Sequence, residues 1–186
     1  YKVILASGSP RRRELMAGLG VNYEVRILPD VDESYPDTLQ GEEIPLYIAK
    51  EKADAYIPMM QPDELIITAD TIVWLDSKVL GKPRDREDAL QMLRTMSGRT
   101  HEVFTGVCIT TTDWQRSFTA QTEVRFATLS EDEIIYYVDN FKPMDKAGAY
   151  GVQEWIGFIG VENISGSYYN IMGLPVQKLY RELLKV

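Results

Sequence analysis

The order of apolar and polar positions predicts alternating strands and helices in the first half of the chain. A short apolar run over 3–6 indicates a buried strand, and Leu15, Met16 and Leu19 then recur at helical spacing. Pro10 suits the first turn of that helix, because its missing N–H has no intrahelical partner there. The elements expected in this half are strands over 3–6, 23–28 and 65–75, a helix that begins near Pro10 and for which Gly18 and Gly20 both offer a stop, an acidic turn-rich segment over 29–41 and a helix over 44–56.

In the second half, Asp85 and Ser130 each precede an apolar stripe at helical spacing, which predicts two capped helices. Alternating positions over 101–112 and 116–128 predict a long hairpin. The glycine-rich and aromatic segment 148–160 is expected to be a loop with a short strand, and a last helix is expected after Gly173-Leu174-Pro175. Strands and helices alternate early and hairpin pairing comes later, so the pattern predicts an α/β fold with a mixed sheet.

The turn between the first strand and the first helix has the composition of an anion site. It holds two serines, a glycine and three successive arginines at a helix N-terminus, where free N–H groups and the helix dipole favour phosphate. Ser7, Ser9 and Arg12 are therefore candidate phosphate contacts. Adjacent helical positions point in different directions, so at most two of the arginines can face one ligand. The alternative is an ordinary capped helix start with a solvated arginine face.

Asp70 interrupts the apolar strand predicted over 65–75. Aspartate is disfavoured in strand interiors, and a buried carboxylate needs a cation, hydrogen-bond donors or solvent in a cleft. A general base or a magnesium ligand meets that description. The alternative is a hydrogen-bonded structural aspartate at a β-bulge.

Four other polar residues are candidate ligand contacts. Lys52, on the helix over 44–56, and Lys82, in a Gly-Lys-Pro turn that lacks P-loop glycine spacing, are candidate phosphate contacts. Glu33, in the acidic segment, is a candidate metal ligand, and the Gln153 amide can recognise the edge of a base. The alternatives are a solvated lysine at 52, a solvated acidic loop around Glu33, and a purely structural glycine loop around Gln153.

Length, charge and residue composition argue against several classes of function. The 186 residues suit one domain or two fused lobes, and the net charge of −8 argues against binding to polymeric nucleic acid. No apolar run approaches the ~20 residues that span a bilayer, so no membrane partner is expected. The lone Cys108 permits no intrachain disulfide and favours the reducing cytoplasm. His101 is the only histidine, which disfavours histidine-based triads and metal sites.

Eight short motifs, weak singly but specific in their order and spacing, resemble the Maf family of nucleoside triphosphate pyrophosphatases over essentially the whole chain. They are Ser7-Gly8-Ser9-Pro10-Arg11-Arg12, Glu51-Lys52-Ala53, Ala69-Asp70-Thr71, Gly81-Lys82-Pro83, Ser97-Gly98, Thr105-Gly106-Val107, Asp145-Lys146-Ala147-Gly148-Ala149-Tyr150-Gly151 and Gly173-Leu174-Pro175.

The resemblance implies a Maf/ITPase-like α/β fold: an elongated, twisted mixed sheet with flanking helices, forming two lobes around a cleft within one domain over 1–186. It also implies hydrolysis of a nucleoside triphosphate to the monophosphate and pyrophosphate, with Mg²⁺ or Mn²⁺, as house-cleaning of nucleotide pools. The family's proposed proton acceptor matches Asp70. Arg11, Thr71 and Gln153 match the branch that acts on dTTP and UTP.

Together, these features predict that the Ser7-to-Arg12 turn, Lys52 and Lys82 hold the triphosphate, while Asp70 and Glu33 hold the metal. Asp70 is expected to act as base, metal ligand or both. Two rival functions stay open: a nucleotidyltransferase, and a nucleotide-binding regulator of septum formation without turnover. The oligomeric state is open, with a homodimer as one option.

Overall fold

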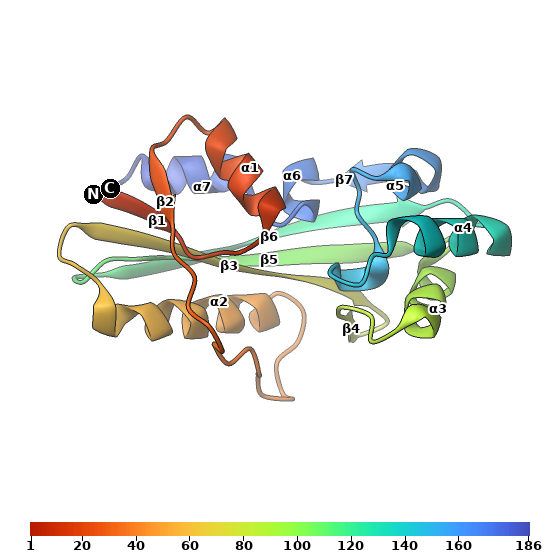
Figure 1. Cartoon of the computed structure of the whole chain (residues 1–186), viewed down its shortest axis with the longest axis horizontal. Coiled ribbons are helices and arrows are strands. Elements are labelled where there is room, and N and C mark those ends of the chain that lie inside the picture. The colour runs from red at the N-terminus through yellow and green to blue at the C-terminus, as the bar shows by residue number, and fades with distance from the viewer. The chain divides into compact units, whose positions relative to one another are not determined.

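The protein is described over residues 1–186 by a computed structural model, which shows an α/β fold built on a mixed seven-stranded sheet (Figure 1). The strands are β1 (Lys2–Leu5), β2 (Tyr23–Val25), β3 (Glu64–Leu75), β4 (Lys78–Leu80), β5 (Thr100–Thr110), β6 (Gln115–Phe126) and β7 (Val161–Ser165). Their order is β2-β1-β3-β5-β6-β7, with β4 paired to β3. β1 runs parallel to β2 and β3, whereas β4 and β7 are antiparallel to β3 and β6. The predicted fold class is confirmed.

The helices flank the sheet, and the chain divides into two compact units. The helices are α1 (Pro10–Gly18), α2 (Glu43–Tyr56), α3 (Arg86–Met96), α4 (Glu131–Phe141), α5 (Trp155–Gly160), α6 (Tyr168–Ile171) and α7 (Val176–Leu183), with 3₁₀ turns η1 (Ile57–Met59) and η2 (Ala147–Ala149). Unit 1 contains Tyr1–Thr71, Thr105–Ala120 and Gly173–Val186, and unit 2 contains Ile72–Phe104 and Gln121–Met172.

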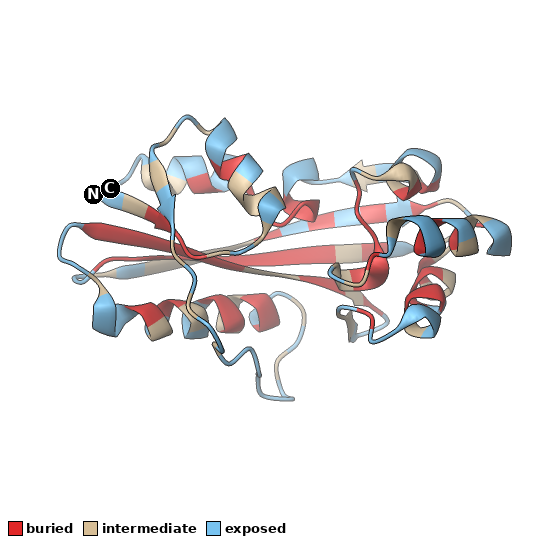
Figure 2. Cartoon of the chain, viewed as in Figure 1, coloured by how far each residue is buried: buried red, intermediate tan, exposed pale blue.

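Unit 1 packs helices on both faces of its strands, with α2 on one face and α1 and α7 on the other (Figure 1). Ile4, Leu5, Ile66 and Ile67 in the parallel pair β1 and β3 are fully buried, and the strands carry most of the red colour in Figure 2. Strands covered on both faces are expected to be continuously apolar, as the runs over 3–6 and 65–67 are. The interruption at Asp70 therefore stands out physically as well as in the sequence.

Gly106 on β5 lets the sheet approach the first turn of α2 closely. A Cβ at this position would lie 2.5 Å from the backbone of Pro45 and of Leu46. Any larger residue would push α2 away from the strands. The glycine of the Thr105-Gly106-Val107 motif is therefore explained by close packing. This packing also places α2, the helix that carries Lys52, against the sheet.

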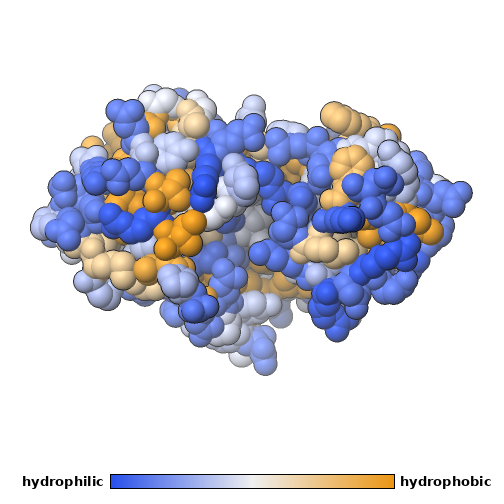
Figure 3. Space-filling view, in the orientation of Figure 1, coloured by the Kyte–Doolittle hydropathy of each residue, from blue (hydrophilic) through white to orange (hydrophobic).

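β2 is shorter than predicted, because it ends at Val25 rather than near residue 28. Its partner β1 ends at Leu5, which pairs with Val25, so no further parallel partner is available. Val25 and Ile27 are exposed at this sheet edge, where Figure 3 shows apolar side chains around β2. A short edge strand limits pairing with other chains.

A buried ion pair anchors the segment that follows β2. Arg26 Nη1 and Nη2 donate to Glu64 Oε2 and Oε1 at 2.9 and 2.6 Å, and Glu64 is 2% exposed. These bonds from Arg26 lower the pKa of Glu64 to about 2. A depressed carboxyl pKa adds stability that is present above the unfolded value of about 4.3 and is lost as pH falls towards 2.

Arg26→Ala is expected to lower the free energy of unfolding at pH 7 by roughly 2 kcal/mol, less than the ~3–5 kcal/mol typical of fully buried pairs because Arg26 is partly exposed. Denaturant unfolding at pH 7 and pH 3 measures the difference, which should shrink at pH 3, because Glu64 becomes protonated in the unfolded chain and in the variant that lacks Arg26. Lys2→Ala is the control, since its pair with Glu24 is exposed on both sides. Equal losses for the two variants would contradict a special role for the buried pair.

Unit 2 confirms the helix starts that local signals predicted. Asp85 caps α3 by accepting from Asp88 N, and Ser130 and Glu133 form a capping box at α4. Inside the unit, His101 Nε2 lies 2.6 Å from the Tyr150 hydroxyl, and burial lowers the pKa of His101 to about 4. A neutral, buried imidazole fits the prediction that the only histidine belongs to a strand rather than to a catalytic group.

The prediction for 148–160 is wrong at its end, because 155–160 forms helix α5 and the strand β7 begins only at Val161. Gly157 explains the difference. A Cβ there would lie 1.9 Å from the carbonyl oxygen of Val152, so the glycine permits tight packing of the helix against the preceding segment. The short helix α6 was likewise not predicted.

Candidate active site

The turn from β1 to α1 forms as predicted, with Ser9 as the N-cap of α1. Ser9 Oγ accepts from Arg12 N at 3.3 Å, and Ser7 Oγ accepts from Ser9 N at 3.2 Å. The capped helix start that the sequence left as an alternative is therefore present. The solvated arginine face is not, because the Arg12 side chain is turned into unit 1.

Arg12 connects three segments of unit 1 that lie far apart in the sequence. Its Nε donates to the carbonyl of Gly173 at 2.7 Å, and its Nη2 donates to Thr71 Oγ1 at 3.0 Å. Gly173 has a φ of 112°. Burial lowers the pKa of Arg12 from its ordinary value, while the charge of Asp70 opposes that shift. The guanidinium is thus a fixed positive charge near Asp70.

Asp70 lies near the middle of β3 and faces a lysine. Lys52 Nζ is 3.4 Å from Asp70 Oδ1 and 3.2 Å from Glu33 Oε1, and it donates to the carbonyl of Ala69 at 3.1 Å. The side chains of Lys52 and Asp70 are only 15% and 14% exposed. The solvated lysine that was the alternative for Lys52 is therefore excluded.

Burial raises the pKa of Asp70, and the positive charges of Lys52 and Arg12 oppose that rise. The nearby carboxylate of Glu33 adds to it. Perturbed carboxyl groups flanked by fixed cations are typical of sites that accept protons or bind anionic ligands. Asp70 combines partial water access with two cationic neighbours, an arrangement in which a carboxylate can accept a proton and the cations can bind an anion.

Thr71, a predicted site residue, pairs with a threonine that was not predicted to belong to the site. Thr71 Oγ1 lies 2.8 Å from Thr105 Oγ1, and Thr105 is fully buried. The Thr105-Gly106-Val107 and Gly173-Leu174-Pro175 motifs were visible in the sequence. Nothing in their spacing indicated that Thr105 meets Thr71 or that the Gly173 carbonyl receives Arg12.

Two predicted site residues belong to unit 2. Lys82 is exposed in the turn after β4, which is tied to η2 by a bond from Gly148 N to the carbonyl of Gly81 at 3.1 Å. Gln153 is exposed in the turn before α5. The other predicted residues, all in unit 1, are Ser7, Ser9, Arg11, Arg12, Glu33, Lys52, Asp70 and Thr71.

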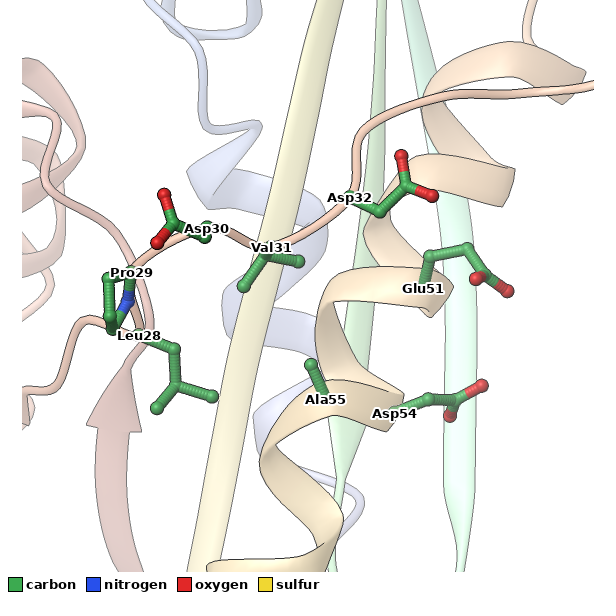
Figure 4. A pocket seen from close by; sticks show the side chains of 8 residues that line it. All are labelled: Leu28, Pro29, Asp30, Val31, Asp32, Glu51, Asp54 and Ala55. Atoms are coloured by element: carbon green, nitrogen blue, oxygen red, sulfur yellow. The ribbon is translucent and has the colours of Figure 1, made fainter.

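A separate acidic depression of about 540 Å³ lies under the loop after β2 (Figure 4). Its lining residues are Leu28, Pro29, Asp30, Val31, Asp32, Glu51, Asp54 and Ala55. Figure 4 shows the carboxylates of Asp32, Glu51 and Asp54 on one side of α2, with that of Asp30 on the opposite side of the loop. In residues 1–186 no three His, Cys, Asp or Glu side chains gather closely enough to hold a metal by themselves. None of the helices has the length and apolar character needed to cross a bilayer.

Comparisons with known proteins agree with the resemblance in the sequence. The model of the Maf-like protein family matches residues 2–186. The dTTP/UTP pyrophosphatase of Bacteroides thetaiotaomicron is 72% identical over 186 residues, which cover 100% of this chain and 96% of that protein. The dTTP/UTP pyrophosphatase of Bacteroides fragilis strain YCH46 is 71% identical over 183 residues, or 98% of this chain and 95% of that protein.

Among solved structures, the Staphylococcus aureus Ham1 protein matches with a TM-score of 0.55 at 15% identity, covering 100% of this chain and 98% of that one. At that identity the likeness concerns the fold alone. Because the family model and the close relatives span nearly the whole sequence, the chain belongs to the Maf family of Maf-like proteins.

Proposed function

We propose that this protein hydrolyses dTTP and UTP to the nucleoside monophosphate and pyrophosphate. The observation that carries the proposal is Asp70, nearly buried in β3 and flanked by Lys52 and Arg12. Attack of water on a phosphate chain is assisted by a carboxylate that accepts the proton of the water and by cations that neutralise the phosphate charge, and this site has both. Relatives above 70% identity that are named dTTP/UTP pyrophosphatases support the substrate class.

In the proposed reaction, Asp70 takes a proton from water as the oxygen of that water attacks the α-phosphorus. The bond between the α-phosphorus and the bridging oxygen breaks, and pyrophosphate leaves with the electron pair. Lys52, Arg12 and the α1 N-terminus with Ser7 and Ser9 hold the phosphate oxygens, and Lys82 adds a further cation. Catalysis of this kind rests on positioning and on charge neutralisation.

The residues present suit a divalent metal, Mg²⁺ or Mn²⁺. Magnesium in phosphate-processing sites is bound by one or two carboxylates together with substrate phosphates rather than by an all-protein cage. Asp70 and Glu33 supply two carboxylates that already share one cationic neighbour, Lys52 Nζ. When bound, the metal would neutralise phosphate charge and polarise the water.

Base selection is proposed for Gln153, with Arg11 and Thr71. A side-chain amide can donate to a carbonyl of uracil or thymine and accept from N3–H, whereas cytosine inverts that pattern. Sites that recognise a substrate by hydrogen bonds discriminate strongly, because the wrong substrate leaves buried polar groups unpaired. The proposed role is removal of unwanted pyrimidine nucleotides in the cytoplasm, the compartment that the lone Cys108 favours.

The test is a turnover panel of dTTP, UTP, CTP, ATP and GTP with Mg²⁺, followed by detection of pyrophosphate and without any acceptor molecule. We expect kcat/KM for dTTP and UTP to exceed the values for the other nucleotides by at least about a hundredfold. Product formed only after an acceptor is added would indicate a nucleotidyltransferase. Tight binding without product at saturating Mg²⁺ would indicate a regulator, and equal turnover of UTP, CTP and GTP would contradict the base selection.

A further inference from the structure

One hydroxyl group in unit 2 holds both ends of the turn that carries Gln153. Tyr137, on α4, is fully buried. Its hydroxyl accepts from Gly151 N at 3.0 Å and donates to Glu154 Oε1 at 2.9 Å. Gly151 and Glu154 are also joined directly, because Glu154 N donates to the Gly151 carbonyl at 2.9 Å. The backbone of Gly151 and the side chain of Glu154, which lie on either side of Gln153, are therefore bound to one point on α4.

The Glu154 carboxylate also forms an ion pair with a lysine. Lys146 Nζ lies 3.5 Å from the same Oε1 of Glu154. The space is closed, since a Cβ at Gly151 would lie 2.4 Å from Glu154 Oε1 and 3.0 Å from Lys146 Cε. The Tyr137 ring itself stacks on Phe141, with centroids 5.2 Å apart. The Tyr137 hydroxyl is thus held in one position by the packing around it.

Gln153 differs from its neighbours in being exposed. Its side chain is presented outward by a turn whose conformation depends on Gly151, Glu154 and Tyr137. An amide that recognises a base must hold its donor and acceptor in a set direction, and errors of a few tenths of an ångström weaken the contact. The anchoring of this turn is consequently a means of setting that direction.

We propose that Tyr137 is a positioning residue that fixes the Gln153 turn through Glu154 and Gly151, and thereby sets the preference for uracil and thymine over cytosine. The inference rests on the proposed function. It assigns a role to a buried tyrosine of unit 2. The chemistry at phosphorus is left to Asp70 and its neighbours.

The test compares Tyr137→Phe with the parent protein, using kcat and KM for UTP and CTP. Loss of one hydrogen-bonding group is worth roughly a 2- to 10-fold change. We expect the ratio of kcat/KM for UTP to that for CTP to fall by about that factor, through a higher KM for UTP and with kcat changed less than about threefold. Tyr136→Phe is the matched control, because it makes the same chemical change at an exposed neighbour on α4.

A double-mutant cycle with Gln153→Ala separates positioning from general stability. In the Gln153→Ala background, adding Tyr137→Phe should leave the UTP-to-CTP ratio unchanged, because the group being positioned is gone. Glu154→Gln keeps an acceptor for the Tyr137 hydroxyl and should retain most of the ratio, whereas Glu154→Ala should lose it. Folding of every variant is checked by thermal unfolding.

The outcomes distinguish the two proposals. A parent protein that hydrolyses no nucleotide overturns the proposed function itself. A selective parent whose Tyr137→Phe variant keeps its UTP-to-CTP ratio overturns the positioning role alone. A ratio that falls equally with and without Gln153 also overturns it, since Tyr137 would then act by another route.

Discussion

Replacing Asp70 with asparagine is expected to lower kcat for UTP by about 10²–10⁴-fold while the fold is retained. Asparagine keeps the shape of the side chain but cannot accept the proton from water. Lys52 still has Glu33 and the Ala69 carbonyl as partners, so the substitution does not leave a lysine isolated. Steady-state kinetics on purified variant and parent decide the question, with pyrophosphate release as the readout.

Asp113→Asn is the matched control, because it makes the same change at an exposed carboxylate in the β5–β6 turn. It should leave kcat within about twofold of the parent value. An Asp70→Asn variant that keeps more than a third of the parent's kcat would show that the carboxylate is not the base.

The same substitution has a stability signature with a definite sign. Burial raises the pKa of Asp70, so its ionised form is disfavoured in the folded protein. The stability that it contributes is present below the unfolded pKa of about 3.9 and is lost as pH rises through the higher folded value. The melting temperature of Asp70→Asn relative to the parent should therefore rise with pH, and a difference that falls with pH would contradict the direction of the shift.

Arg12→Ala is expected to lower kcat/KM more than it lowers stability. A charge-assisted contact to phosphate is worth roughly 1.5–3 kcal/mol, or about 10- to 150-fold in kcat/KM. Some loss of stability is also expected, because the Gly173 carbonyl and the Thr71 hydroxyl lose their shared donor. Kinetics and denaturant unfolding on the same preparations separate the two effects.

Arg12→Lys refines the result, since lysine keeps the charge but lacks the planar group that reaches both partners. We expect it to recover part of kcat/KM and little of the stability. Arg84→Ala serves as the control, because the Arg84 side chain is 86% exposed. Normal kinetics in an Arg12→Ala variant with a strongly lowered melting temperature would mean that the arginine is structural only.

Features that depend on contacts between residues close in the sequence were predicted better than features that depend on packing. Asp85 before α3 and Ser130 before α4 accept hydrogen bonds from backbone N–H groups three residues on, and both helix starts were predicted correctly. Ser9 makes the same kind of contact before α1, where a capped helix start was only the alternative interpretation. Glycine was harder to interpret. In α5, Gly157 serves close packing against Val152, and composition alone does not separate that use of glycine from a loop.

The joint roles of the candidate site residues, above all Lys82 and Gln153, stay predictions. Their residue types indicated phosphate and base contacts, and the chain's membership of the Maf family agrees with that interpretation. The structure adds the immediate surroundings of each residue, including the Tyr137 anchor behind Gln153. No periodicity or motif in the sequence indicated that anchor.

By itself, the sequence determined the α/β class, most helix starts and the family, because these depend on local patterns and on the order of short motifs. It also showed that a carboxylate, Asp70, interrupts an otherwise apolar strand. Only the tertiary structure decided which groups surround that charge. Arg12 meets the carbonyl of Gly173 across 161 positions of sequence, and Lys52 reaches Asp70 across 18. Such contacts follow from how α1 and α2 pack on the sheet, and packing at that range leaves no periodic trace in the order of the residues.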